Sequence, residues 1–308
     1  MIRRVILFSI LACSLRADSF FLIVSGLGGE PEYEQRFSGW AKDIDKIAHT
    51  EPNAKVDTLI GPDATKVNIE AKLRALATAS KAGDSLVVML IGHGSYDESN
   101  YKFNIPGPDI TASDLAGLLD KIPAQQLIVD MTSSSGGSIP LLQNQKVKRV
   151  IVTATKSGTE KNATVFARYW IEAMRDPTAD TDKNEVITAL EAFRYAEQKT
   201  AKFFEDQKRL ATEHALIEDT GKGDGVKAPA PENGQGMVAG RFPLVHMGSV
   251  AALIKDPAKQ QLLKHKEELE QSIDELKYKK ASMALPDYRR QLQVFLVDLA
   301  KTQEELDK

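Results

Sequence analysis

Apolar runs and amphipathic segments alternate through the first two-thirds of the chain. Strands that are buried on both faces have mostly apolar sequences, and helices between them form the crossovers of a parallel sheet. The pattern therefore predicts an α/β fold, with a mostly parallel sheet flanked by helices on both faces. The predicted strands cover residues 20–26, 54–61, 85–92, 125–131 and 147–155, and the predicted helices between them cover 33–48, 65–80 and 111–122.

The C-terminal segment changes to an apolar period of seven residues, which is interrupted at "LPD". Two helices of roughly 20 residues, each about 30 Å long, are expected to pair as an antiparallel hairpin. Such a coiled-coil stripe predicts a packing seam, which closes within the hairpin or on another chain, so self-association is one expected partnership. The repeat consists of Leu262, Leu269, Leu276 and Met283 with Ile273 between them, then Leu285, Leu292, Leu299 and Leu306 with Tyr288 and Phe295.

The N-terminus has the pattern of a secretory signal peptide. "MIRR" supplies positive charge, "VILFSILA" is a short apolar stretch, and Ala17 is a small residue suited to cleavage. We expect an exported protein, periplasmic or secreted, and lipid anchoring at Cys13 is the less favoured alternative. The expected organisation is a signal peptide at 1–17, an α/β domain at 18–217, a Gly/Pro-rich loop with a candidate last strand at 218–248, and the hairpin at 249–308.

Two predicted strands end in residues that can carry chemistry. His93 lies in "GHG" after the strand at 85–92, and "TSSSGG" follows the strand at 125–131. Ligands of parallel sheets bind at the carboxyl ends of the strands. Each motif by itself is also typical of a plain turn or helix cap. Their joint placement favours a functional site.

These two motifs resemble the caspase and legumain type of cysteine peptidase, which includes gingipains and metacaspases. In that family a strand ends in His-Gly, and a later strand ends in an acidic residue, a spacer and the nucleophilic cysteine shortly before Ser-Gly. The resemblance spans about residues 20–208 and implies a caspase-like fold. It also implies that His93 is the catalytic histidine and that the Gly94 amide helps stabilise an oxyanion.

The nucleophile departs from the family pattern. Counting forward from Asp130 places Thr132 in the cysteine's position, whereas counting back from "SGG" places Ser133 there. Cys13 is the only cysteine, so the folded body has no thiolate, which is the source of the family's reactivity. Cysteine peptidase activity is therefore not expected.

Three functions follow from this departure. The favoured one is a catalytically inactive homologue, a pseudoenzyme that binds a peptide or protein. The alternatives are a peptidase or esterase that uses Ser133 or Thr132 with His93, and an assembly protein that acts through the hairpin. Nucleic acid is not an expected partner, because the formal net charge is −3 and no long basic run occurs.

The segment after the last parallel strand again resembles legumain-like chains, in which it helps to form the wall of the substrate pocket. Thr155, Ser157 and Glu160 are the candidate pocket residues. The alternative is structural: Ser157 or Thr159 would cap a helix that starts near Lys161.

"DTDKNEVITALE" has the spacing of an EF-hand-type loop, which predicts calcium as the one candidate cofactor. Glu185 occupies the sixth place, where glycine normally makes the sharp turn. The alternative is an acidic connection between helices in which Thr188 or Asp182 is a cap. The predicted ligands are Asp180, Asp182 and Asn184 at places one, three and five, the Val186 carbonyl at seven, and Glu191 at twelve.

Overall fold

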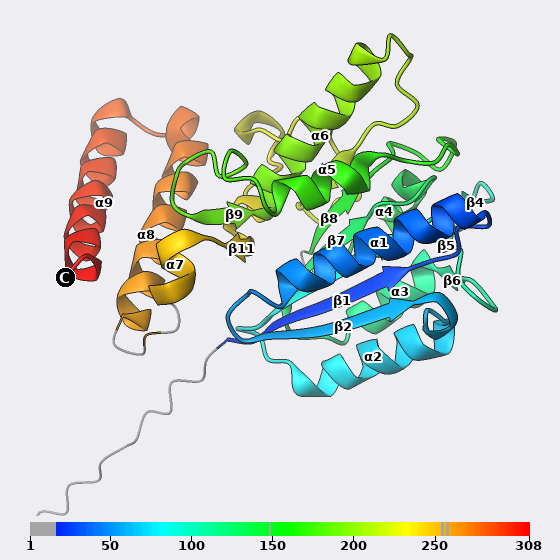
Figure 1. Cartoon of the computed structure of the whole chain (residues 1–308). Coiled ribbons are helices and arrows are strands. Elements are labelled where there is room, and N and C mark those ends of the chain that lie inside the picture. Colours follow the sequence, from blue (N-terminus) through cyan, green and yellow to red (C-terminus); the bar gives the residue numbers. More distant parts are fainter. Residues whose placement is uncertain (1–16, 148, 254–255, 257–258) are drawn as a thin grey trace, which may run out of the picture.

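The structure is a computed structural model that describes residues 17–147, 149–253, 256 and 259–308. Cys13 and all of the predicted signal peptide except Ala17 lie outside these ranges. Within the described residues, six strands form the central sheet in the order β10-β8-β7-β3-β1-β2 (Figure 1). These strands are β1 (Ser19–Ser25), β2 (Ala54–Ile60), β3 (Ser85–Ile91), β7 (Gln125–Asp130), β8 (Val150–Thr153) and β10 (Leu216–Glu218).

Five of these strands run parallel, and β10 pairs antiparallel with β8 at one edge. Successive side chains of a strand point to opposite faces, and β1 divides accordingly: Phe21 and Ile23 belong to one apolar core, and Phe20 and Leu22 to the other. Helices cover both cores (Figure 1). The predicted fold class, a mostly parallel sheet between helical layers, is confirmed.

The helices of the body begin at residues suited to helix ends. Proline occupies the first turn of α1, and Thr111 and Thr188 each form a reciprocal capping box with the acidic residue three positions later. The body helices are α1 (Pro31–Ala48), α2 (Lys66–Ala79), α3 (Ala112–Leu119), α4 (Ile139–Leu142), α5 (Phe166–Ala173) and α6 (Ala189–Asp206), with 3₁₀ turns at Gly61–Asp63, Ser135–Ser138, Pro231–Asn233 and Ala239–Arg241.

Two small sheets accompany the central one. Strands β4 (Gly94–Tyr96), β5 (Tyr101–Phe103) and β6 (Ile110–Thr111) form an antiparallel sheet directly after His93. The candidate last strand is present as β11 (Pro243–His246), but it pairs with β9 (Val186–Thr188) and not with the central sheet. The sequence pattern did not predict β10, which occupies the edge position.

The C-terminal helical hairpin is confirmed. Helix α7 (Gly248–Leu253) leads to α8 (Gln260–Lys279), which packs against α9 (Leu285–Leu306), with a 3₁₀ turn at Lys280–Ser282 between them. Leu269, Ile273 and Leu276 are buried in the seam, but Leu285 is 50% exposed. Its predicted place in the seam is wrong, because it begins α9 next to the exposed turn. Among the described residues, no helix combines the length and hydropathy of a membrane span.

Candidate functional site

The structure brings the two predicted motifs together. Strands β3 and β7 are parallel neighbours, so the loops that follow them leave the sheet at the same edge. His93 is half-buried, and its ring packs edge-on against the rings of Tyr33 and Phe37, with centroid distances of 5.0 and 5.1 Å. Both aromatic residues come from α1, one turn apart. Helix α1 therefore positions the imidazole.

The surroundings of His93 favour a neutral imidazole. Burial lowers the pKa of His93, while a hydrogen bond to the backbone of Gly28 and the nearby carboxylates of Glu30 and Glu34 oppose this shift. A neutral imidazole can accept a proton and is the form that a general base requires.

The Ser133 hydroxyl is engaged by the backbone of Gly94. It accepts a hydrogen bond from the Gly94 N–H at 3.1 Å and donates one to the Gly94 carbonyl oxygen at 3.0 Å. Ser133 is only 2% exposed. Ser133, a predicted nucleophile, and Gly94, the predicted oxyanion donor, are therefore hydrogen-bonded to each other.

Thr132 lies one layer deeper, in a buried polar network. Its hydroxyl donates to the Asp130 carboxylate at 2.7 Å and shares a hydrogen bond of 2.6 Å with the phenol of Tyr101. The Tyr101 phenol also lies 3.0 Å from Asp130, so its one proton is shared between Thr132 and Asp130, and Ser138 donates to Asp130 at 3.3 Å. Burial raises the pKa of Asp130 to about 6, against the opposing effect of these donors. Thr132, Tyr101 and Asp130 are fully buried, so this network supports the loop from beneath.

Asp97 and Asp130 are the carboxylates that the sequence brings closest to the motifs, and both are engaged elsewhere. Asp97 accepts hydrogen bonds from Ser99 and Asn100 and pairs with Lys102. Asp130 holds the network around Thr132. The groups that orient His93 are therefore the aromatic rings of α1 and the Gly28 backbone.

Close packing leaves no room for a side chain at Gly94. A Cβ atom there would lie 2.5 Å from the Ser133 carbonyl oxygen and 2.6 Å from the Tyr101 ring. Gly94 is consequently required for the approach of the two loops, in addition to its predicted role as an amide donor. The neighbouring Ser134 adopts the left-handed region with φ of 58°, and its N–H donates to the Glu160 carbonyl at 2.8 Å.

The three candidate pocket residues lie together in the loop after β8. Thr155 is fully buried and accepts a hydrogen bond from the Gly136 N–H at 2.9 Å. The Ser157 hydroxyl bonds to Thr159 at 2.8 Å. The carboxylate of Glu160 lies 2.6 Å from Nδ1 of His214. Side chains of Thr155 and Glu160 thus hold the loop in place.

The predicted helix cap in this loop is wrong, because α5 begins at Phe166 and not near Lys161. Residues 154–165 instead form an irregular connection. The first amides of the helix, those of Val165 and Phe166, donate to the buried carboxylate of Glu213. A residue far along the sequence therefore does what a local hydroxyl was expected to do.

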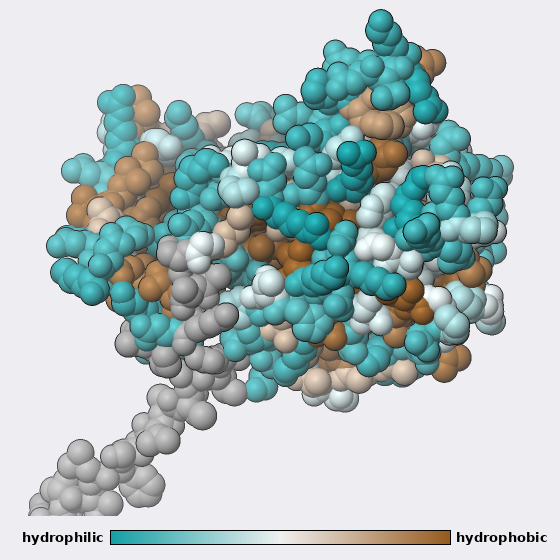
Figure 2. All heavy atoms as spheres, viewed as in Figure 1, coloured by the Kyte–Doolittle hydropathy of each residue, from teal (hydrophilic) through white to brown (hydrophobic). Residues whose placement is uncertain are grey.

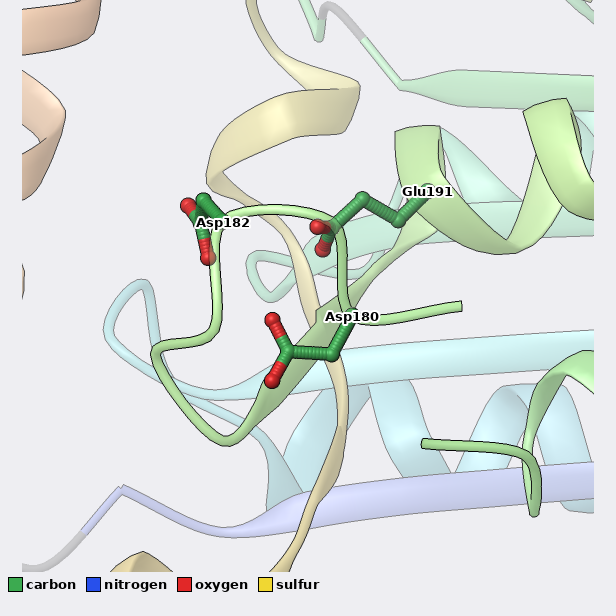
Figure 3. Close-up of side chains that lie close together, drawn as sticks. All are labelled: Asp180, Asp182 and Glu191. Atoms are coloured by element: carbon green, nitrogen blue, oxygen red, sulfur yellow. The ribbon is translucent and has the colours of Figure 1, made fainter. Parts of the chain in front are cut away.

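Three of the predicted calcium ligands converge in the loop before α6 (Figure 3). Carboxylate oxygens of Asp180, Asp182 and Glu191 lie within 4.8 Å of one another. Partial desolvation and the charges of Glu191 and Asp180 raise the pKa of Asp182 to about 6, although part of its side chain is exposed. The side-chain oxygen of Asn184 accepts from the Val186 N–H at 2.8 Å.

The sharp turn of the loop is made without glycine. Glu185, at the sixth place, adopts φ of 66°, in the left-handed region that glycine favours. Glu191 also completes the capping box of α6, and its two oxygens accept four hydrogen bonds from Thr181 and Thr188. Thr188 is therefore a helix cap, as one alternative predicted. A calcium ion would have to replace some of the donors on Glu191.

Comparison with known proteins identifies the family. A model of the caspase domain matches residues 28–217, which is more than half of the chain. The chain belongs to the caspase family. A search of curated proteins returns no match.

Two solved structures are similar to this caspase-family chain. A protein from Geobacter sulfurreducens has a TM-score of 0.46 at 11% identity, over 72% of this chain and 97% of its own. Caspase-1 from Spodoptera frugiperda has a TM-score of 0.44 at 14% identity, over 66% of this chain and 87% of its own.

Several residues of this caspase-family site were not found from the sequence. Tyr33 and Phe37 have the four-residue spacing of a helix face, which predicts only that they pack together. Tyr101 was assigned no role, although it joins Thr132 and Asp130. A buried tyrosine has no local signal that names its partner across 31 residues of sequence.

Proposed function

We propose that this chain is an exported, catalytically inactive caspase homologue that binds an extended peptide or protein segment beside His93. The observation that carries the proposal is the closed pair of Ser133 and Gly94. A second support is the absence of any cysteine after Cys13 in the full sequence. Without a thiolate, catalysis would depend on a serine or threonine hydroxyl.

Hydroxyl catalysis needs a base that takes the hydroxyl proton and free donors for the oxyanion. The Ser133 hydroxyl donates to the Gly94 carbonyl, so its proton is directed to the backbone. The Gly94 N–H already donates to Ser133, so it is not free for an oxyanion. Attack by Ser133 would require both hydrogen bonds to break, and attack by Thr132 would require a fully buried hydroxyl to reach the surface.

The same geometry is suited to holding a ligand. The Tyr96 ring beside the loops is packed so closely that a Cβ atom at Gly137 would lie 2.7 Å from it, and one at Gly158 would lie 2.1 Å from it. Tyr33 and Phe37 fix the ring of His93. Such a preformed surface loses little conformational freedom when a peptide binds.

Catalysis is tested by intact-mass spectrometry after incubation with a fluorophosphonate, which labels activated hydroxyls. We expect no adduct on the wild-type chain or on the His93→Ala variant. Ser133→Ala and Thr132→Val serve as matched controls for the two candidate nucleophiles. An adduct that disappears with His93→Ala and maps to Ser133 or Thr132 would overturn the proposal in favour of the hydrolase.

Binding is tested separately with a fluorescent library of extended peptides and measured by anisotropy. For peptides that bind the wild-type chain, we expect Tyr33→Ala to lower the affinity at least tenfold, because the ring beside His93 is removed. The exposed control Arg74→Ala should leave the affinity unchanged. No binding by any peptide in the library would contradict this part of the proposal. Export is checked by N-terminal sequencing of the secreted chain, with Asp18 expected as the first residue.

A further inference from the structure

The outer face of α9 carries apolar side chains that the hairpin does not cover. Val294 is 62% exposed, and Leu296 and Val297 are each 48% exposed. The seam side of the same helix is much less accessible, with Thr302 and Leu306 buried. Figure 1 places α9 on the side of α8 away from the central sheet, and Figure 2 shows hydrophobic surface over the hairpin.

Part of this face forms a shallow, open depression on the surface of α9. Its lining is formed by Val294 and Val297 with polar neighbours from the turns before and after them. At 100° per residue, Val297 points almost directly away from the seam that contains Leu299 and Leu306. Val297 is therefore at the centre of the uncovered face, which is available to a partner.

Two pairs of opposite charges on this side of the helix are related symmetrically about Val297, whereas Asp298 and Lys301, which also line the face, have uncharged counterparts. Arg290 precedes Val297 by seven residues, and Glu304 follows it by seven, so all three lie on one side of the helix. Arg289 and Glu305 are related in the same way at eight residues. A helix with this arrangement is complementary to an antiparallel copy of itself, and a parallel copy would place like charges opposite each other.

We propose that the occupant of this face is a second copy of the chain, whose α9 crosses antiparallel at Val297. The two-fold axis passes near Val297, and the same surface is used by both copies. Arg290 then faces Glu304 of the second copy, and Val294 faces Ala300 of the second copy. This proposal is independent of the proposed function, because it uses no residue of the loops after β3 and β7.

The existing partners of the two charges do not oppose this pairing. Arg290 pairs with Asp287 at 2.5 Å and Glu304 with Lys308 at 3.6 Å, and all four side chains are about half or more exposed. Exposed pairs of this kind contribute at most about 1 kcal/mol, so exchanging them costs little. The charges therefore determine orientation, and the apolar residues supply affinity.

One helix from each copy makes a smaller contact than a standard interface of about 1,600 Å². We therefore expect reversible self-association with a dissociation constant in the micromolar range. Sedimentation velocity of the full chain over a concentration series measures this equilibrium. The expected result is a monomer that shifts to dimer between roughly 1 and 100 μM, as that range of dissociation constants requires.

The decisive variants test the centre and the charges of the contact. Val297→Glu should raise the dissociation constant at least tenfold. Arg290→Glu and Glu304→Arg should each weaken the dimer, because each places like charges opposite one another twice. The double variant R290E/E304R should recover most of the wild-type affinity, which only an antiparallel self-pairing predicts.

Val67→Glu is the matched control, since Val67 on α2 is 75% exposed and lies in the body. It should leave self-association unchanged, and circular dichroism should show native helix content for every variant. A chain that stays monomeric up to 100 μM would overturn the proposal. So would a dimer that resists Val297→Glu, or a double variant that is weaker than either single one.

Discussion

The α/β body and the C-terminal hairpin bury their apolar residues to different extents. In the body, each strand of the central sheet contributes alternate residues to two cores, so that residues such as Leu22 and Ile23 are fully buried. Among the described residues of the C-terminal region, Val250, Leu263 and Leu306 form a small cluster together with Val186 of β9, and α9 leaves apolar side chains in solvent.

This difference shows which region is complete by itself. Helices on both faces of a sheet cover all of its apolar surface, whereas two paired helices can cover only the sides that face each other. In the body, the polar groups that resemble a catalytic site, those of Ser133, Gly94 and Thr132, also have hydrogen-bond partners within the protein. The hairpin instead keeps a surface that a second copy can cover.

The sharpest test of this comparison is the same kind of truncation in both regions. Leu22→Ala removes a fully buried side chain from β1 and should lower the free energy of unfolding by roughly 4 kcal/mol. Val294→Ala removes an exposed side chain from α9 and should change it by about 0.5 kcal/mol or less at low protein concentration. Urea unfolding followed by circular dichroism measures both. Equal losses would contradict the distinction between the regions.

A second test addresses the buried network beneath the site. Burial raises the pKa of Asp130 from 3.8 to about 6, so the folded state binds a proton that the unfolded state has released in this range. The contribution of Asp130 to the free energy of unfolding is therefore fully present below pH 4, and it is lost as the pH rises through 6. A shift of about two units corresponds to about 3 kcal/mol.

Asp130→Asn should remove this loss, because its amide can still accept from Thr132 and Tyr101 and can donate to Ser138. Its stability relative to the wild type should therefore rise between pH 4 and pH 7 in urea unfolding. Asp97→Asn is the control, since the pKa of the exposed Asp97 is lowered to about 2, outside this window. Parallel pH profiles for wild type and Asp130→Asn would argue against an ionised, desolvated carboxylate.

The smallest effect is expected at the junction of the two regions. Asp182 borders a pocket that α8 completes with Glu267 and Glu270, and burial raises the pKa of Glu270 to about 7. Calcium binding at Asp180, Asp182 and Glu191 stays a prediction, with an affinity of about 10⁻⁴–10⁻³ M because Glu191 already holds four donors. At 5 mM calcium this stabilises the fold by about 1 kcal/mol or more.

Isothermal calorimetry with millimolar calcium tests this prediction. We expect a binding heat that Asp182→Asn abolishes and that the control Asp206→Asn retains, since Asp206 is exposed at the end of α6. Silence of the wild-type chain at these concentrations would leave the acidic loop as a helix connection capped by Thr188.

Local periodicity was sufficient for much of the fold and for the outline of the site. Residues 85–92 and 125–131 are apolar enough to predict two buried strands, and the carboxyl ends of parallel strands must meet at one edge, so His93 and the hydroxyl loop were expected to be neighbours. The seven-residue repeat likewise predicted the hairpin. Strands β4, β5, β6, β9 and β10 escaped prediction because two or three residues are too few to show a period.

What the sequence by itself determined was which segments are strands and helices and which polar residues follow them, because burial imposes a period on each segment. Only the tertiary structure decided that Ser133 bonds to Gly94 across 39 residues and that Glu213 holds the start of α5. These outcomes depend on positions accurate to tenths of an ångström between distant segments. Hydrogen bonds and close packing are sensitive at that scale, whereas hydrophobic periodicity is not.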